Sequence, residues 1–154
     1  MVPDQHGEMM DDEHEIEIRM VTAWDEEAIA DLYRAGGWWK EGWDPSGIAA
    51  LIRGSFAFAV AVDTESGRAI GMGRVLSDGI ADAFIEDVVV LSSYRHMGIG
   101  TMIVSALLER CRSANIGWIV LIAEPGLDEF YTPLGFLRME GYIPMRYQGD
   151  GRGA

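Results

Sequence analysis

Val88-Val89-Val90-Leu91-Ser92-Ser93-Tyr94-Arg95-His96-Met97-Gly98-Ile99-Gly100-Thr101 is the stretch that decides the fold of this chain. It begins as an apolar β-branched run, passes through a loop with two glycines, and enters a segment rich in helix formers. The pattern predicts a strand, a loop and a helix. Such a loop leaves backbone N–H groups without partners at the mouth of a helix, where the helix dipole favours negative charge. Glycine has no Cβ, so an anion can approach the backbone closely. The stretch therefore predicts a phosphate or pyrophosphate site.

The spacing of the glycines distinguishes this loop from two common phosphate motifs. A Rossmann loop needs Gly-x-Gly-x-x-Gly, and a Walker loop needs a lysine after its last glycine. Here the pattern is Arg95-x-x-Gly98-x-Gly100, followed by Thr101. It resembles the acyl-CoA motif of the GNAT superfamily of N-acetyltransferases, Gln/Arg-x-x-Gly-x-Gly/Ala. The downstream Phe130-Tyr131-x-x-x-Gly135-Phe136 adds to this resemblance. The alternative is a tight strand–helix turn that binds no ligand.

Length and composition favour a globular chain with its own core. The chain has 154 residues, of which 49% are hydrophobic. No apolar run reaches the roughly 18–20 residues of a membrane span, and the N-terminal residues are acidic rather than basic, so we expect a cytoplasmic protein. A single cysteine, Cys111, excludes an internal disulfide. The histidines His6, His14 and His96 have no metal-ligand spacing, and we expect no metal.

The charge is strongly negative and unevenly distributed. The formal net charge is -13, and residues 1–17 hold seven acids and no lysine or arginine. Without those seven acids the chain would carry -6, so the body is moderately acidic. This argues against nucleic acid as a partner, because phosphates require a basic surface. An acidic body is compatible with a cationic amine substrate, but it also simply keeps a protein soluble.

Periodicity and turn residues divide the chain into an acidic disordered tail (1–14), a single domain (15–148) and a loose C-terminal tail (149–154). The expected order is β-α-α-β-β-β-α-β-α-β-β, which is the order of the GNAT fold. The resemblance implies an α/β (α+β) architecture: a mixed central sheet of about seven strands, splayed between the fourth and fifth and flanked by about four helices. The expected strands are 16–20, 56–62, 69–76, 83–90, 118–123, 136–139 and 144–147, and the expected helices are 22–35, 45–53, 102–110 and 127–134.

The resemblance also supplies candidate catalytic residues. Its usual general acid is the tyrosine of the Phe-Tyr motif, here Tyr131, whose alternative role is packing beside the cofactor. The candidate bases are Glu86 and Asp87, which strand alternation places on opposite faces unless a bulge intervenes. Glu86 falls where arylalkylamine acetyltransferases carry a histidine, and Asp87 resembles the aspartate of Asp-Val-Val-Val in plant serotonin N-acetyltransferases. We rank Glu86 slightly ahead; bulk water alone, or a merely structural role for either acid, are the alternatives.

The implied cosubstrate is acetyl-CoA. By the resemblance, backbone groups of 88–90 pair with the pantetheine amides, and N–H groups from Arg95 or His96 through Thr101 surround the pyrophosphate. The strands are expected to splay at Ala123–Glu124 to admit the thioester. The Arg95 side chain either reaches a phosphate or is solvated. The implied cofactor-binding residues are Val88, Val89, Val90, Arg95, His96, Met97, Gly98, Ile99, Gly100, Thr101, Phe130 and Leu134.

Three of the five tryptophans, Trp38, Trp39 and Trp43, lie in one short connection. Tryptophan is costly to expose, so they either pack on the body or line an acceptor pocket. The sequence thus indicates transfer of an acetyl group from acetyl-CoA to a primary amine, with small amines, aromatic ones included, as favoured acceptors. The alternatives are a peptide N-terminal or lysine acetyltransferase and a non-catalytic CoA-binding sensor. A homodimer through the last hairpin also stays open.

Overall fold

The computed structural model describes residues 15–149. The predicted acidic tail and most of the predicted C-terminal tail lie outside the described residues. The strands are β1 (Ile16–Met20), β2 (Ala57–Asp63), β3 (Arg68–Ser77), β4 (Asp82–Val90) and β5 (Trp118–Leu121). The helices are α1 (Glu26–Ala35), α2 (Ile48–Gly54), α3 (Ile99–Ser113) and α4 (Asp128–Tyr131), with short 3-10 turns at Pro45–Gly47, Ser92–Tyr94 and Thr132–Leu134.

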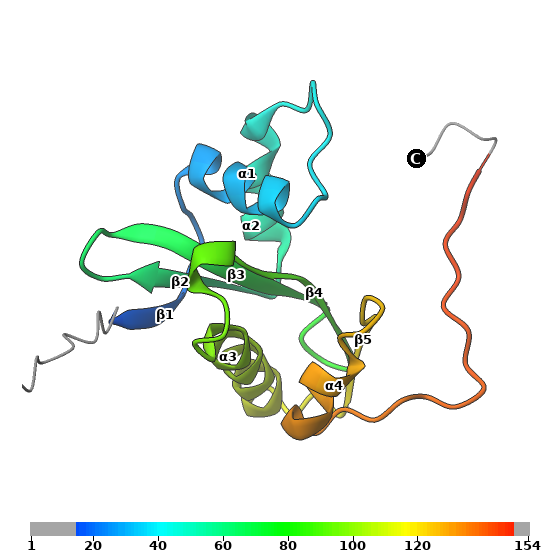
Figure 1. Ribbon diagram of the computed structural model, residues 1–154. Coiled ribbons are helices and arrows are strands. Elements are labelled where there is room, and N and C mark those ends of the chain that lie inside the picture. Colours follow the sequence, from blue (N-terminus) through cyan, green and yellow to red (C-terminus); the bar gives the residue numbers. More distant parts are fainter. Residues whose placement is uncertain (1–14, 150–154) are drawn as a thin grey trace, which may run out of the picture.

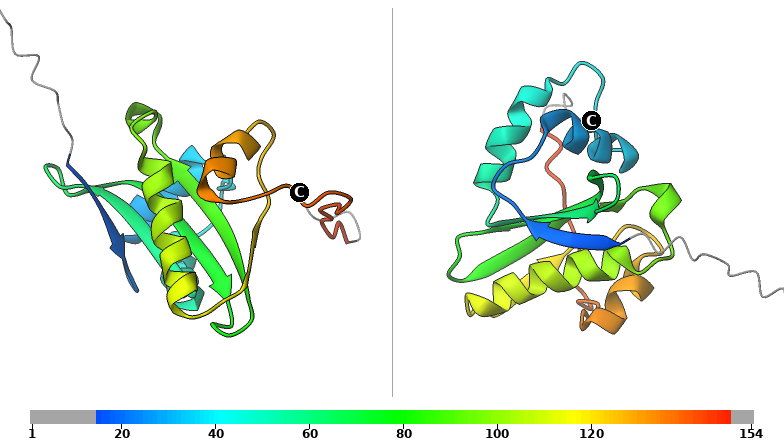
Figure 2. Two further views of the ribbon diagram at one scale, coloured as in Figure 1. Left: turned by 90° about the horizontal axis from the view of Figure 1, so that it is seen from below. Right: turned by 90° about the vertical axis from the view of Figure 1, so that its left-hand side faces the viewer.

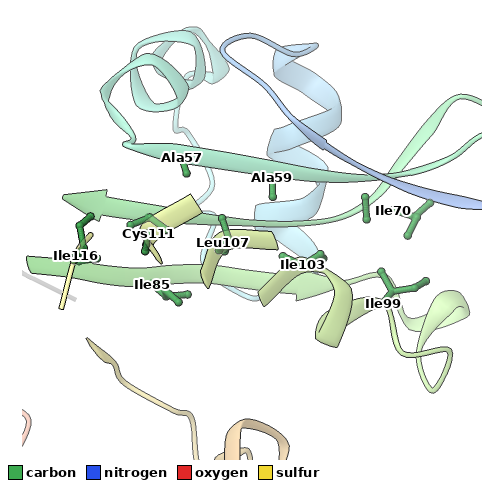
Figure 3. Close-up of a cluster of buried hydrophobic side chains, with 12 residues drawn as sticks. Ala57, Ala59, Ile70, Ile85, Ile99, Ile103, Leu107, Cys111 and Ile116 are labelled. Atoms are coloured by element: carbon green, nitrogen blue, oxygen red, sulfur yellow. The ribbon is translucent and has the colours of Figure 1, made fainter. Parts of the chain in front are cut away.

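The molecule has three layers built around one mixed sheet of order β1-β2-β3-β4-β5. The first four strands are antiparallel neighbours, and β5 pairs parallel to β4. Helices α1 and α2 cover one face, and α3 and α4 lie on the other (Figures 1 and 2). Each face has its own apolar cluster; the one between the sheet and α3 is shown in Figure 3. The prediction of a mixed GNAT-type architecture with four helices is confirmed.

The C-terminal part of the prediction is wrong in two respects. The sheet of the described chain has five strands rather than about seven, because 136–139 and 144–147 form no hairpin and pair with no described strand. Gly141 turns the chain with φ +80°, and Pro144 has no N–H to donate to a ladder. As a result β5 is an edge strand in spite of its apolar composition, and its Trp118 is 50% exposed.

The opening between β4 and β5 begins earlier than predicted. The last paired residues are Ile85 on β4 and Leu121 on β5. Beyond them β4 continues to Val90 while β5 ends, so the strands separate two residues before the expected Ala123–Glu124. No helix among residues 15–149 is long and apolar enough to cross a membrane.

Helix α3 packs very closely on β3, because the strand presents glycines to it. A Cβ built on Gly73 would lie 2.9 Å from Ile103 Cγ2 and 3.0 Å from Leu107 Cδ1. Overpacking of this kind costs about 1–3 kcal/mol, so Gly73→Ala should lower the free energy of unfolding by that amount in urea titrations. Gly54→Ala is the control, because its Cβ would meet nothing within 4 Å and φ there is not positive. Equal stability of the two variants would contradict the close packing.

Candidate active site

A bulge in β4 brings both candidate bases onto one face of the sheet. Met72 pairs with Val89, whereas Arg74 pairs with Glu86, so β4 holds one residue more than β3 over this interval. The backbone takes up the extra residue at Asp87, whose φ is +60°. Such a bulge resets the alternation of a strand.

The reset of β4 can be followed in its core contacts. Ile85 packs in the cluster under α3, and the next residues to do so are Val88 and Val90, three and five positions on. Glu86 therefore does not share a face with these valines, although it lies two and four residues before them, a spacing that places side chains on one face of a regular strand. Glu86 and Asp87 point instead to the layer of α1 and α2, where both meet Arg74.

Arg74 holds the two carboxylates together. Its Nε donates to Asp87 Oδ2 at 2.6 Å, and its Nη2 donates to Glu86 Oε2 at 3.2 Å. The Tyr33 hydroxyl of α1 also donates to Asp87 Oδ2, at 2.7 Å. The side chains of Arg74, Asp87 and Glu86 are only 15%, 20% and 32% exposed. One cation thus faces two acids, and the cluster carries a negative charge when both acids are ionised.

Burial gives the two acids different properties. It raises the pKa of Glu86, an effect that the Asp87 charge reinforces and Arg74 opposes. Asp87 Oδ2 already accepts two hydrogen bonds, which hold that carboxylate in place. Burial, followed by the Asp87 charge, also raises the pKa of Tyr33 well above its ordinary value, so Tyr33 stays a donor. Glu86, which accepts a single hydrogen bond in the described chain, is therefore the freer of the two carboxylates.

Sequence reasoning identified neither Arg74 nor Tyr33 as part of a site. Arg74 lies in the middle of an otherwise apolar strand, Arg68–Ser77. A charge in such a strand needs a partner, and this was the signal that could have indicated the cluster. Nothing in the sequence of Tyr33 distinguishes it from an ordinary core tyrosine. Among residues 15–149, no three His, Cys, Asp or Glu side chains form a group that could hold a metal ion.

The glycine loop has the backbone geometry expected of an anion site. His96 and Gly98 have φ +65° and +76°, and Gly98 caps α3 without any side-chain hydrogen bond. Gly98 followed by helical Ile99 forms a left-handed/right-handed pair, which turns successive N–H groups toward one point. Within the described chain, no acceptor is found for the N–H groups of residues 96–101.

Arg95 belongs to the turn before this loop rather than to the row of N–H donors. Its backbone N–H donates to Ser92 O at 3.4 Å, so the row begins at His96. The Arg95 side chain folds back, and its Nε lies 3.4 Å from Val90 O at the end of β4. The sequence left open whether the pyrophosphate-binding N–H groups begin at Arg95 or at His96, and the geometry favours the range from His96 to Thr101.

Helix α4 places a buried tyrosine beside the glycine loop. Phe130 packs on Gly100, where an added Cβ would lie 3.1 Å from Phe130 Cζ. The Tyr131 ring lies edge-on between Phe130 and Phe136, with centroid distances of 4.8 and 5.8 Å. Its hydroxyl donates to no described residue. Burial, and then the charge of Glu124, raise the pKa of Tyr131. Leu134 is half-buried in the following 3-10 turn.

These parts converge on the opening between β4 and β5. Residues 86–90 of β4 lack a partner strand on the β5 side within the described chain. The acids begin where this pairing ends, and the strand leads into the glycine loop at its other end. Tyr131 approaches from the opposite wall, near Glu124 beyond β5. The acid pair and the glycine loop thus lie at the two ends of the unpaired part of β4, and Phe130, next to Tyr131, contacts the glycine loop at Gly100.

The three tryptophans divide between packing and a pocket. Trp38 stacks on Gly36, where any Cβ would overlap its ring. Trp39 and Trp43 meet edge-on at 5.6 Å and line an open pocket of about 380 Å³. Its remaining lining residues are Tyr33, Gly42, Asp44, Gly47, Ile48 and Leu51. Tyr33 thus lines this pocket and, through its hydroxyl, is bonded to Asp87.

A model of the acetyltransferase (GNAT) family matches residues 14–136, and the chain belongs to this family. Among its relatives, an uncharacterized N-acetyltransferase, ycf52, from Porphyra purpurea is 31% identical over 110 residues, 71% of this chain and 63% of that protein. Histone acetyltransferase TAP1 from Glycine max is 31% identical over 128 residues, 75% of this chain and 52% of that protein. Serotonin N-acetyltransferase 2 from Oryza sativa subsp. japonica is 34% identical over 73 residues, 48% of this chain and 36% of that protein. The chain spans less than two thirds of the length of these relatives.

A solved structure shares the fold at low identity. AAC(6')-Iy in complex with the bisubstrate analog CoA-S-monomethyl-acetylneamine matches with a TM-score of 0.68 and 19% identity, over 86% of this chain and 98% of that one. The likeness supports the overall fold.

Proposed function

We propose that this protein transfers the acetyl group of acetyl-CoA to a primary amine of small size. The observation that carries the proposal is the convergence of an acid pair, a buried tyrosine and a row of unused loop N–H groups on one opening of the sheet. Family membership supplies the reaction class, and the acceptor is inferred from the pocket.

The chain offers groups that fit acetyl-CoA. The N–H groups of His96 to Thr101 suit a pyrophosphate, because they point to one place at the start of α3 and Gly98 leaves the approach open. The edge of β4 at 88–90 can pair with the pantetheine amides. Phe130 and Leu134 lie on the α4 side of the opening. Acetyl-CoA would supply an activated acetyl group as its thioester.

The transfer needs three proton movements, and we assign two of them to residues of this chain. An alkyl amine with a pKa of about 10 is protonated near neutrality, so Glu86, directly or through water, accepts a proton and frees the nitrogen. The nitrogen forms a bond to the acetyl carbon and loses its second proton to solvent, and the carbon–sulfur bond breaks. Tyr131 gives its proton to the sulfur, and both residues return to their starting states by exchange with solvent. Asp87, held by Arg74 and Tyr33, positions the cluster.

The acceptor pocket supports a small amine with an apolar or aromatic body. Trp39, Trp43 and Leu51 supply apolar walls. Asp44 adds a carboxylate, and the N–H of Ser46, which donates to it at 2.9 Å, lowers the pKa of Asp44. A relative is named for serotonin, an arylalkylamine. A peptide acceptor is the second candidate, favoured by the relative that is named a histone acetyltransferase.

The proposed activity is tested by thiol release from acetyl-CoA with a panel of amines. The panel contains tryptamine, serotonin, phenethylamine, spermidine, an aminoglycoside and short peptides. Turnover of arylalkylamines would support the pocket, and turnover of peptides alone would move the acceptor site away from it. Binding of CoA without any turnover would support the sensor alternative and contradict the proposal.

Trp43→Ala should raise KM for phenethylamine about three- to tenfold, because an aromatic pair contributes about 0.5–1.5 kcal/mol. Trp43 is half exposed, so its removal should leave the fold intact. Trp43→Phe is the control, since it keeps a ring and should retain most of the affinity. An unbranched aliphatic amine should show a smaller change. Equal effects on both amines would show that Trp43 does not contact the acceptor.

A further inference from the structure

Three aromatic rings surround the pocket that lies on the α1 and α2 side of the sheet (Figure 1). Tyr33 comes from α1, and Trp39 and Trp43 come from the connection between the two helices. The Tyr33 and Trp39 rings are tilted by 42° with centroids 6.4 Å apart, and Trp39 meets Trp43 edge-on. Because the three rings are not parallel, they enclose the pocket from more than one side.

The two tryptophan rings already attract cations of the protein itself. Arg34 Cζ lies 5.4 Å from the Trp39 ring centroid, and Lys40 Nζ lies 5.6 Å from that of Trp43. A cation within about 6 Å of a ring centroid is drawn to the negative face of the ring. Neither Arg34 nor Lys40 lines the pocket, so neither of these cations fills it. The rings therefore suit a cationic ligand as well as an apolar one.

Among the described residues that line the pocket, Asp44 alone carries a charge. Its Oδ1 accepts a hydrogen bond from the Ser46 N–H, which lowers the pKa of Asp44, so the group is ionised near neutrality. Its Oδ2 accepts no hydrogen bond from residues 15–149. The chain around it is acidic as well, since residues 26–44 hold five acids and two basic residues. The pocket thus has a negative group with an oxygen free for a ligand.

A second negative group lies within one side chain of this pocket. Tyr33 lines the pocket and donates its hydroxyl to Asp87. Asp87 and Glu86 share the single cation Arg74, so the acid pair is negative when both carboxylates are ionised. The lining of the pocket other than Asp44 is aromatic, aliphatic or glycine. The site therefore combines two separate negative groups with apolar walls.

We propose that the acceptor is a diamine, with one ammonium held in the aromatic pocket beside Asp44 and the other nitrogen presented to Glu86. The inference rests on the proposed function, because it uses the same acid pair and the same pocket. A monoamine matches only one of the two negative groups, whereas a diamine matches both. Its methylene chain packs on Ile48 and Leu51, as the stem of a lysine packs on apolar surface. The length of one tyrosine side chain corresponds to a spacer of about four to six carbons.

The role of the second charge is tested by comparing cadaverine with hexylamine, in which a methyl group replaces the second ammonium. The wild type should prefer cadaverine about three- to thirtyfold in kcat/KM, because an exposed cation–π contact and an exposed ion pair each add a modest attraction. Asp44→Asn keeps an oxygen for the Ser46 N–H but removes the charge, and should lower this preference about two- to fivefold. Glu41→Gln is the matched control, because it removes an acid of the same connection that does not line the pocket. It should keep the preference.

The role of the rings is tested by Trp43→Leu, which keeps an apolar wall but removes an aromatic face. Trp43 is 50% exposed, so the fold should tolerate the change. The preference for cadaverine over hexylamine should fall about two- to fivefold. Tetramethylammonium has no nitrogen that can be acetylated, and it should compete with cadaverine but not with acetyl-CoA. This competition should weaken in Trp43→Leu.

Binding measured without turnover separates this inference from the proposed function. Addition of cadaverine to the full chain should change its tryptophan fluorescence, and the change should shrink in Trp43→Leu. A fluorescence response without thiol release from acetyl-CoA by any amine would support the pocket as a diamine site and contradict the proposed function. The diamine inference is overturned, with the proposed function intact, if amines turn over but cadaverine is preferred by no more than the statistical factor of its two equivalent nitrogens. Equal preferences in Asp44→Asn and Glu41→Gln would overturn it as well.

Discussion

Tyr131→Phe is expected to lower kcat about 10²–10⁴-fold, because the variant cannot protonate the departing thiolate. The ring stays, and with it the edge-on contacts to Phe130 and Phe136. The hydroxyl donates to no described residue, so Tm should change little. The KM for acetyl-CoA should also stay close to that of the wild type. Turnover at saturating substrates within a factor of two of the wild type would contradict the acid role.

The pH dependence gives a second test of Tyr131. A general acid must be protonated, so activity falls as the pH rises through its pKa. Burial and the Glu124 charge raise the pKa of Tyr131, so this alkaline fall should lie above the ordinary phenol value of about 10. The fall should be missing from the residual activity of Tyr131→Phe. Tyr142→Phe is the control and should behave like the wild type, because Tyr142 is 71% exposed in the C-terminal segment.

Glu86→Gln is the other change with a large expected effect, a loss of about 10²–10⁴-fold in kcat/KM near neutrality. The loss should shrink above the pKa of the amine, about 10 for a lysine-like acceptor, where the acceptor is already neutral. A base must be deprotonated, so wild-type kcat should rise with pH through the pKa of Glu86, which burial raises above the ordinary glutamate value. This rise of kcat with pH, the acid limb of the profile, should be absent from Glu86→Gln.

Asp87→Asn separates the two acids. The Asp87 charge raises the pKa of Glu86, and Arg74 lowers it. Removing that charge, and freeing Arg74 to act on Glu86 alone, should lower the pKa of Glu86 and move the acid limb to lower pH without abolishing it. The opposite pattern, with the limb lost in Asp87→Asn and kept in Glu86→Gln, would make Asp87 the base. If the acid limb of the pH profile were unchanged in both variants, water rather than either carboxylate would accept the proton.

The elements with strong periodicity or clear end signals were predictable from the sequence. The first strand was predicted at its observed bounds, Ile16–Met20, and the order of strand, loop and helix around residues 88–101 was predicted correctly, although the helix begins at Ile99 rather than at residue 102. The Asp44-Pro45 pair marked the start of the second helical segment. In each case local preferences and the tertiary fold agree, which is when sequence patterns are most informative.

The acid cluster could not be predicted because it depends on pairing register. The residue types at 86 and 87 do not reveal that β4 has one residue more than β3 at this point. Alternation alone placed the acids on opposite faces and left only one of them for the site. Arg74 was visible as a charge in an apolar strand, but its partners follow from the bulge.

The prediction of a C-terminal hairpin failed for a different reason. Residues 136–147 have the alternation of a strand pair. This pattern predicts strand-like segments, but it does not identify the strand with which they pair. A hairpin prediction assumes that the partner lies in the same chain. In the described structure residues 136–147 pair with no strand, so β5 is an edge strand although its residues are apolar.

The extra residue in β4 also bears on how relatives of this protein should be compared. The number of residues between Ile85 and Val88, rather than their types, decides how many side chains of this strand face the opening. A chain shorter by one residue here could keep the equivalents of Val88 and Val90 under α3 and still present a single acid. Alignments that place gaps freely in this strand would therefore equate sites of different chemistry, and comparison of residues 86 and 87 is meaningful only when the bulge is shared.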